Sequence, residues 1–140
     1  MTVEIMKHTE HLAARAALFG AGGWAVENVL FGSRYSALWG GAKIPVLPVY
    51  AIGGLTAEAL GPWLLEREVP WYARAAIYAA VLSGVEYAGC FFDRDVLGAC
   101  SWDYSKQDCA EPLKGCIDWK HAAIWGALGL VIEKLQEAKP

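Results

Sequence analysis

Four apolar stretches separated by short polar stretches run along the chain, and this pattern predicts a helical protein. The first three cover residues 12–31, 44–65 and 71–92. Each is close to the roughly 20 residues that a helix needs to cross the hydrocarbon of a membrane. The fourth is uninterrupted only from His121 to Ile132. It reaches membrane length over 115–135 if Lys120 and Lys134 extend to opposite interfaces.

The second and third stretches have no polar face, which favours membrane helices over a soluble all-helical bundle, the alternative. We therefore predict an all-α fold: an integral membrane bundle of four transmembrane helices in one domain over 1–140. Residues 93–114 would form a capping loop. The composition agrees, because 56% of the residues are hydrophobic and only 19% are charged, with seven Trp and 15 Gly. The net charge of −3 gives no reason to expect nucleic acid.

Polar residues are predicted to converge on one membrane boundary. With four crossings, both termini share one side, and the loops at 32–43 and 93–116 share the other. Glu27 and Glu86 lie near the ends of helices that run toward this loop side, so their carboxylates should have similar depth. The residues expected to join them come from the second helix, the WDYS sequence of the loop and the fourth helix: Tyr50, Trp102, Asp103, Tyr104, Ser105 and His121.

The WDYS sequence is interpreted as a cap over the helix ends. Trp102 and Tyr104 would lie at the interface, while Asp103 and Ser105 would reach toward the two glutamates. An acid inside a membrane helix is a functional candidate by default, and this pocket would suit a small polar or cationic ligand, or a lipid headgroup. The alternatives are that the glutamates pair with Arg34 and Arg94 or bond loop amides, and that His121 is an interfacial anchor.

Residues 23–36 and 84–105 resemble one another. Each segment contains a Glu near a helix end, then an aromatic-rich exit, an Arg, and finally Tyr-Ser. Two repeated helical hairpins in the same orientation would explain this, as in parallel-repeat transporters. Chance similarity in a chain rich in Gly and Ala is the alternative.

The four cysteines, Cys90, Cys100, Cys109 and Cys116, lack the spacing of a zinc site, and no metal site is expected. Disulfides are the favoured interpretation, with reduced thiols as the alternative. We expect Cys100–Cys109 to close a small loop around WDYS, with Cys109–Cys116 as the rival pairing. A Cys90 buried in its helix would remain free.

The motifs "GGWAVE", "PVLPVYAIGG", "GVEY", "SWDYS" and "WGALG" occur in this order between about Gly23 and Gly129. In this arrangement the chain resembles the bacterial integral membrane family described as putative ABC-transporter permease, type IV. The family's marked positions fall on the glutamates, on Tyr50, on the WDYS residues and on four positions read as structural, namely Trp24, Pro45, Pro48 and Gly115. The chain has no Walker A pattern.

The resemblance implies a transporter- or permease-type component of the bacterial inner membrane, crossing it several times. The alternatives are an accessory subunit of a larger membrane complex and a small intramembrane enzyme acting on a lipid-like substrate. No catalytic residue is assigned, because no nucleophile or metal motif accompanies the acids, and no cofactor is assigned. We expect a homo-oligomer or a larger complex, in contact through small residues: Gly20, Gly22, Gly23, Gly53 and Gly54.

Basic residues divide evenly between the two sides and do not fix the orientation. The WDYS loop is the longer one, is richer in acids and holds the cysteines. We therefore expect it outside the cell, with both termini in the cytoplasm.

Overall fold

The computed structural model describes residues 2–31, 46–98, 103–104 and 115–137, without the side chains of 2–10, 27, 28, 30, 31 and 46. These residues form four α-helices: α1 (Thr2–Phe31), α2 (Val46–Glu66), α3 (Trp71–Phe91) and α4 (Trp119–Glu137). A π-helical turn, η2 (Phe92–Val96), continues α3. The described residues include no strand, so the predicted all-α fold of four helices is confirmed.

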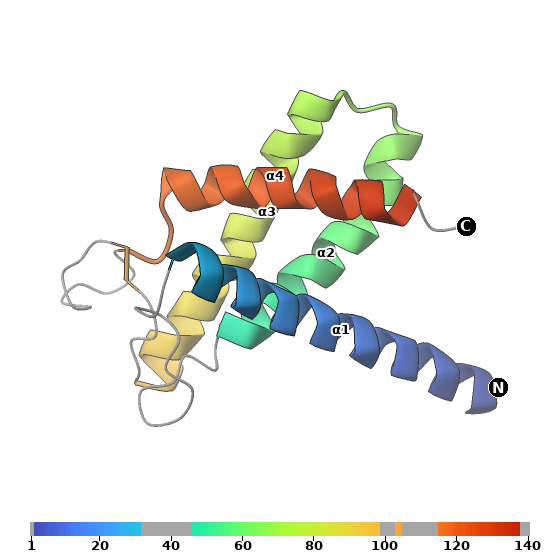
Figure 1. The fold of residues 1–140 in the computed structure, drawn as a ribbon, viewed down its shortest axis with the longest axis horizontal. Coiled ribbons are helices and arrows are strands. Elements are labelled where there is room, and N and C mark those ends of the chain that lie inside the picture. The colour runs from blue at the N-terminus through green and yellow to red at the C-terminus, as the bar shows by residue number, and fades with distance from the viewer. Residues whose placement is uncertain (1, 32–45, 99–102, 105–114, 138–140) are drawn as a thin grey trace.

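The helices pack as two consecutive pairs (Figure 1). In the described residues α1 packs on α2 alone, and α3 packs on α4, while α2 also contacts α3 and α4. The start of α1 and the end of α4 lie on the same side of the molecule (Figure 1). The first turns of α1 extend beyond the other helices, since this helix has 30 residues and is therefore ~45 Å long.

Glycines allow the paired helices to approach closely. A Cβ at Gly54 would lie 2.2 Å from Cγ of Phe19, and one at Gly23 would lie 2.1 Å from the Tyr50 ring. In the other pair, a Cβ at Gly129 would lie 2.2 Å from Cγ of Tyr78. Side chains larger than hydrogen at these positions would force the helices apart, as is usual where membrane helices meet.

Two helix boundaries differ from the predicted ones. The first helix begins at Thr2 instead of residue 12, because the residues before Leu12 contain neither Gly nor Pro and can continue the helix. The fourth begins at Trp119 instead of residue 115, because Gly115 has a left-handed φ of 76° and interrupts helical geometry. The expected capping loop also begins later, since η2 remains helical to Val96.

One stretch among the described residues, Trp71–Val96, is long and apolar enough to cross a membrane. The other helices do not reach that criterion. In α2 and α4, charged residues, prolines and glycines reduce the hydropathy; they include Glu58, Pro62, Lys120 and Glu133. The described residues therefore do not establish the predicted bundle of four membrane spans.

Candidate functional site

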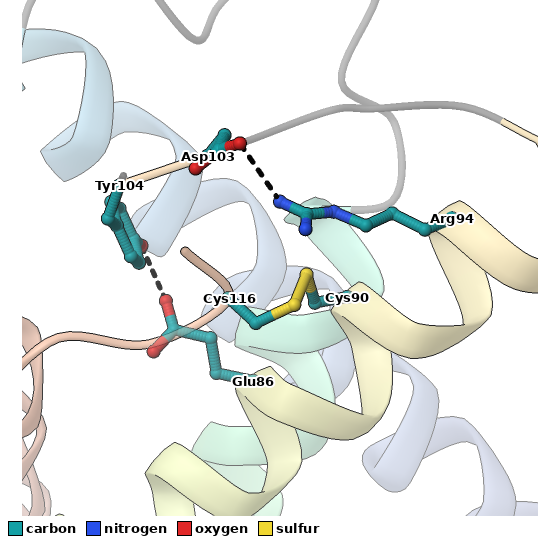
Figure 2. The surroundings of a disulfide bond; sticks show 6 residues. All are labelled: Glu86, Cys90, Arg94, Asp103, Tyr104 and Cys116. Carbon is teal, nitrogen blue, oxygen red and sulfur yellow. Dashed lines mark hydrogen bonds and ion pairs between the residues drawn. A yellow bond between two sulfur atoms is a disulfide. The ribbon is translucent and has the colours of Figure 1, made fainter. Parts of the chain in front are cut away.

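Glu86 lies on the inner face of α3, where its side chain is only 5% exposed. The Tyr104 hydroxyl donates a hydrogen bond to Oε1 of Glu86 at 2.6 Å (Figure 2). The Trp125 indole, on α4, donates to Oε2 at 3.0 Å. Helix α4 and the segment containing Tyr104 thus both bond to one buried carboxylate of α3.

Tyr104 is held over Glu86 by two further contacts. Its backbone N–H donates to the carbonyl oxygen of Gly115 at 2.8 Å. Its ring stacks on His121 of α4, with the ring centres 3.9 Å apart and an interplanar angle of 14°. The phenol therefore reaches Glu86 from a ring that the start of α4 supports.

Asp118 orders the start of α4. Its Oδ1 accepts from the backbone N–H of His121 at 2.8 Å, which is the hydrogen bond of a helix N-cap, and lies 2.9 Å from Nδ1 of the same residue. Burial alone would raise the pKa of Asp118, but the hydrogen bonds from His121 outweigh it and place the pKa below its usual value. The ionised carboxylate thereby orients the His121 ring on which Tyr104 stacks.

Asp103 is directed to a different partner from the one predicted. Its Oδ2 lies 3.6 Å from a guanidinium nitrogen of Arg94, and both side chains are buried (Figure 2). Arg94 was considered as a partner for the helix glutamates, whereas the structure pairs it with Asp103 and bonds Glu86 to Tyr104 and Trp125.

A disulfide joins Cys90, at the end of α3, to Cys116, just before α4. The idea that a buried Cys90 remains free is wrong, and so is the rival pairing Cys109–Cys116, because Cys116 is already bonded. The favoured pairing, Cys100–Cys109, lies outside the described residues. Both bonded cysteines are fully buried.

Glu86, Cys90 and Arg94 are spaced by four residues and therefore share one face of α3 and η2. Each of them binds a residue that follows the helix: Glu86 binds Tyr104, Cys90 binds Cys116, and Arg94 binds Asp103 (Figure 2). We call these three residues the anchoring stripe. It fastens the segment between α3 and α4 to α3 by a hydrogen bond, a covalent bond and an ion pair.

Helix α2 contributes the far wall of the site. The Tyr50 ring lies 5.2 Å from the Trp125 ring, centre to centre. A Cβ at Gly53 would lie 3.4 Å from the same indole, so Trp125 rests against the α2 backbone while donating to Glu86. Pro48 lies in the first turn of α2, and Trp24 is half-buried on α1.

The remaining predicted residues cannot be placed in this site. Glu27 lies on α1, but the structure describes only its backbone. The predicted approach of its carboxylate to Glu86 therefore stays a prediction. Other predicted residues also lie outside the described residues: Pro45, Trp102, Ser105, Cys100 and Cys109.

The family model described as "Putative ABC-transporter type IV" matches residues 17–138 of the chain. The chain belongs to this family. The comparison with curated proteins gives no match, and neither does the comparison with solved structures. Membership of the putative ABC-transporter type IV family thus associates the chain with transport, and the anchoring stripe lies within the matched residues.

For this family member, sequence reasoning missed Trp125, because a Trp on an apolar helix is usually interpreted as a membrane-interface residue. It also missed a second buried cluster. Glu133 of α4 is 1% exposed and accepts from Arg74 at 3.0 Å and from the Tyr78 hydroxyl at 3.0 Å. The available signal was the opposite charge of Arg74, at the start of the third apolar stretch, and of Glu133, just after the fourth, since both lie near the same predicted boundary.

The chemical group that the site offers to a ligand is the Glu86 carboxylate, which accepts hydrogen bonds from Tyr104 and Trp125. No group of three or more metal-ligating His, Cys, Asp or Glu side chains occurs in the part of the chain that is described. A carboxylate that accepts from a phenol and an indole can instead bind a cation or a hydrogen-bond donor that replaces the phenol. The geometry at Glu86 therefore suits the binding of such a ligand.

Proposed function

We propose that the protein is a transporter-type membrane component whose four helices cross the bilayer and whose Glu86 binds a small cation or polar ligand. The observation that carries the proposal is the position of Glu86: a buried acid on the helix best suited to span a membrane, covered by a residue of a loop. Membership of the putative ABC-transporter type IV family supports a role in transport.

The surface of the molecule supports a membrane location. Helix α3 has 21 residues and is therefore ~32 Å long, close to the thickness of the hydrocarbon. Exposed aromatic side chains occur at both of its ends, Trp71 and Tyr72 at one and Phe91 and Phe92 at the other. Large apolar side chains are also exposed on the other helices, among them Leu18, Val29, Ile52 and Val131.

Two ion pairs join charged residues of neighbouring helices within the described part of the bundle. Arg15 of α1 lies 3.3 Å from Glu58 of α2, and Arg74 of α3 lies 2.9 Å from Glu133 of α4. Pairing of this kind lowers the cost of charges at membrane depth. It supports membrane crossing by helices whose average hydropathy alone would not predict it.

In this proposal Tyr104 acts as a gate. A ligand reaches Glu86 only after the Tyr104 hydroxyl leaves Oε1, and Tyr50, Trp125 and His121 then surround the opened site. The segment that carries the gate faces the oxidising side of the membrane, because the Cys90–Cys116 disulfide lies beside it. Both termini are then cytoplasmic.

The test is a ligand-induced shift in the thermal unfolding midpoint of the purified protein in detergent. The probes are Na⁺, K⁺, choline, ethanolamine and spermidine, each at millimolar concentration. We expect at least one of them to raise the midpoint of the wild type and not that of Glu86→Gln. Asp95→Asn, which removes an exposed acid from η2, should retain the shift. Absence of any shift in the wild type, or an equal shift in Glu86→Gln, contradicts binding at Glu86.

An accessory subunit is the second candidate function, because α1 packs against the rest of the described structure through only one of its faces. In the described residues α1 packs on α2 alone and exposes Leu18, Val26 and Val29. Co-purification in a mild detergent separates the two functions: a stoichiometric larger membrane protein that is lost on Leu18→Asn favours the subunit.

A further inference from the structure

A groove lies between α3 and the start of α4, on a face of α3 that adjoins the anchoring stripe. Its volume is about 780 Å³. The floor consists of small residues of α3, namely Ala76, Ala79, Ala80, Ser83 and Gly84, and the mouth consists of Tyr87, Ile117, Asp118, Trp119 and Ala122. We call it the α3–α4 groove.

We propose that the α3–α4 groove binds a zwitterionic phospholipid with an ammonium headgroup, such as phosphatidylethanolamine. The inference rests on the proposed membrane location, but it concerns a site separate from Glu86. The lipid would lie with its acyl chain on the small-residue floor and its headgroup at the mouth.

From the mouth inward, the lining of the groove changes from aromatic and charged to polar and then to apolar. A phospholipid changes in the same order from its headgroup to its acyl chains. At the mouth, Tyr87 and Trp119 are exposed aromatic residues, and Asp118 supplies a carboxylate. Ser83 lies one helical turn deeper than Tyr87, ~6 Å along α3. Ala80 and Ala76 continue the floor at greater depth, where there is only apolar surface. Headgroup, ester linkages and acyl chain follow the same sequence.

Ser83 provides an independent indication of a missing polar partner. Its side chain is 7% exposed, and its hydroxyl makes no hydrogen bond within the described residues. A buried hydroxyl without a partner costs free energy. At this depth a phospholipid presents ester carbonyl oxygens, which are acceptors for such a hydroxyl.

The charges at the mouth match a zwitterionic headgroup. Asp118 is anionic, and Lys120 follows two positions later, with its Nζ 5.8 Å from the Trp119 ring centre. An ammonium can pair with Asp118 while the phosphate pairs with Lys120. Asp118 already binds His121, but a headgroup with only the phosphate charge would bring a second negative charge to this carboxylate with no ammonium to offset it.

A second copy of the chain fits the groove less well. Gly84 opens on free space, since a Cβ there would meet no atom within 4 Å, and small residues every fourth position also suit helix dimers. A parallel two-fold dimer through this face, however, would place two Asp118 carboxylates at the same depth of one interface. This like-charge contact favours the lipid.

The experiment is native mass spectrometry of the detergent-purified protein with equal amounts of phosphatidylethanolamine and phosphatidylglycerol. The wild type should bind the zwitterionic lipid about fivefold more often, as one solvent-exposed charge pair allows. Asp118→Asn keeps an N-cap residue and removes the charge, so it should lose the preference while α4 stays folded. Asp95→Asn, an exposed acid of η2, is the matched control and should keep the preference.

Gly84→Leu tests the floor of the groove. The new side chain projects into open space and should reduce occupancy by either lipid severalfold without lowering the unfolding midpoint. Gly22→Leu is its control, because a Cβ at Gly22 also meets no atom within 4 Å. Equal binding of the two lipids by the wild type, unchanged binding in both groove variants, or a dimer that Gly84→Leu disrupts would each overturn the assignment. Release of the protein from membranes by alkaline carbonate would instead overturn the membrane location.

Discussion

Glu86 and Glu133 are both buried carboxylates between α3 and α4, but different kinds of structure hold them. Glu133 accepts from Arg74 and Tyr78, which both belong to α3. Glu86 accepts from Trp125 of α4 and from Tyr104, which belongs to the segment between the two helices. The Glu133 contacts join α3 and α4 directly, and we call this end the clamp. The contacts of Glu86 depend in addition on the segment between the two helices, to which Tyr104 belongs.

The largest effect should come from breaking the clamp. Arg74→Met leaves the buried Glu133 carboxylate without its guanidinium partner and should reduce the free energy of unfolding by ~3–5 kcal/mol. Arg67→Met is the control, since Arg67 is exposed and should change stability by less than ~0.5 kcal/mol. Thermal unfolding in detergent measures both. Glu133→Gln should partly rescue Arg74→Met, and failure of that rescue would mean that the pair does not act as a unit.

At the other end, the disulfide should be the strongest of the three anchors. The double variant Cys90→Ala/Cys116→Ala frees a segment whose ends are 26 residues apart. It should lose roughly 2–4 kcal/mol, because the unfolded chain regains the conformational freedom of that loop. Chemical unfolding measures the loss. Mapping of the non-reduced protein by mass spectrometry should recover the Cys90–Cys116 pair, and recovery of Cys116 bonded to a different cysteine would refute the arrangement.

Removing the gate hydroxyl should cost less. Tyr104→Phe keeps the stacking on His121 but deletes the donor to the Glu86 carboxylate, a bond worth ~1.5–3 kcal/mol. Tyr87→Phe, at the same end of α3 but partly exposed, should have almost no effect. The thermal unfolding midpoints of the two variants measure this difference. Equal midpoints would mean that Tyr104 does not hold the segment onto α3.

Matched glycine substitutions test how tightly each end is packed. Gly129→Ala forces the Tyr78 ring away and should cost ~1–3 kcal/mol, as overpacking does. Gly53→Ala approaches the Trp125 ring only to 3.4 Å, an ordinary contact, and should be nearly neutral. Thermal unfolding compares them. A larger loss from Gly53→Ala would reverse the picture of a rigid Glu133 end and an adjustable Glu86 end.

The smallest effect concerns pH. The pKa of Asp118 is lowered in the folded protein, so its ionised form stabilises the structure above the pKa of the unfolded chain. This contribution disappears as the pH falls below about 4. The wild type should therefore lose slightly more stability on acidification than Asp118→Asn, in unfolding midpoints measured between pH 3 and pH 6. Parallel pH profiles of the two proteins would contradict a role for the ionised cap.

The sequence predicts which residues lie at the same end of the bundle when the direction of a helix is enough to decide this. Glu86 and the WDYS sequence were assigned to the same boundary because α3 runs toward the loop that contains WDYS, and in the structure Tyr104 donates to Glu86. The spacing of the anchoring stripe was present in the sequence as well. Its recognition requires knowing that each of the three residues binds a residue beyond the helix.

The rest depends on contacts between distant segments. Arg74 and Glu133 are 59 positions apart, and only the packing of α3 on α4 brings them together. Four cysteines allow three pairings, and the choice depends on where η2 ends and α4 begins. Trp125 could not be distinguished from an interfacial Trp, because its partners lie on α2 and α3 and its own helix gives no sign of them.

The pairing of neighbouring helices also bears on biogenesis. Since α1 packs on α2 and α3 packs on α4, most contacts join segments that leave the ribosome one after the other. Such local topology is associated with fast folding. Each pair can assemble as soon as its second helix emerges, and docking of α4 on α2 completes the structure. A ribosome stalled before α4 should therefore already carry a formed α1–α2 pair.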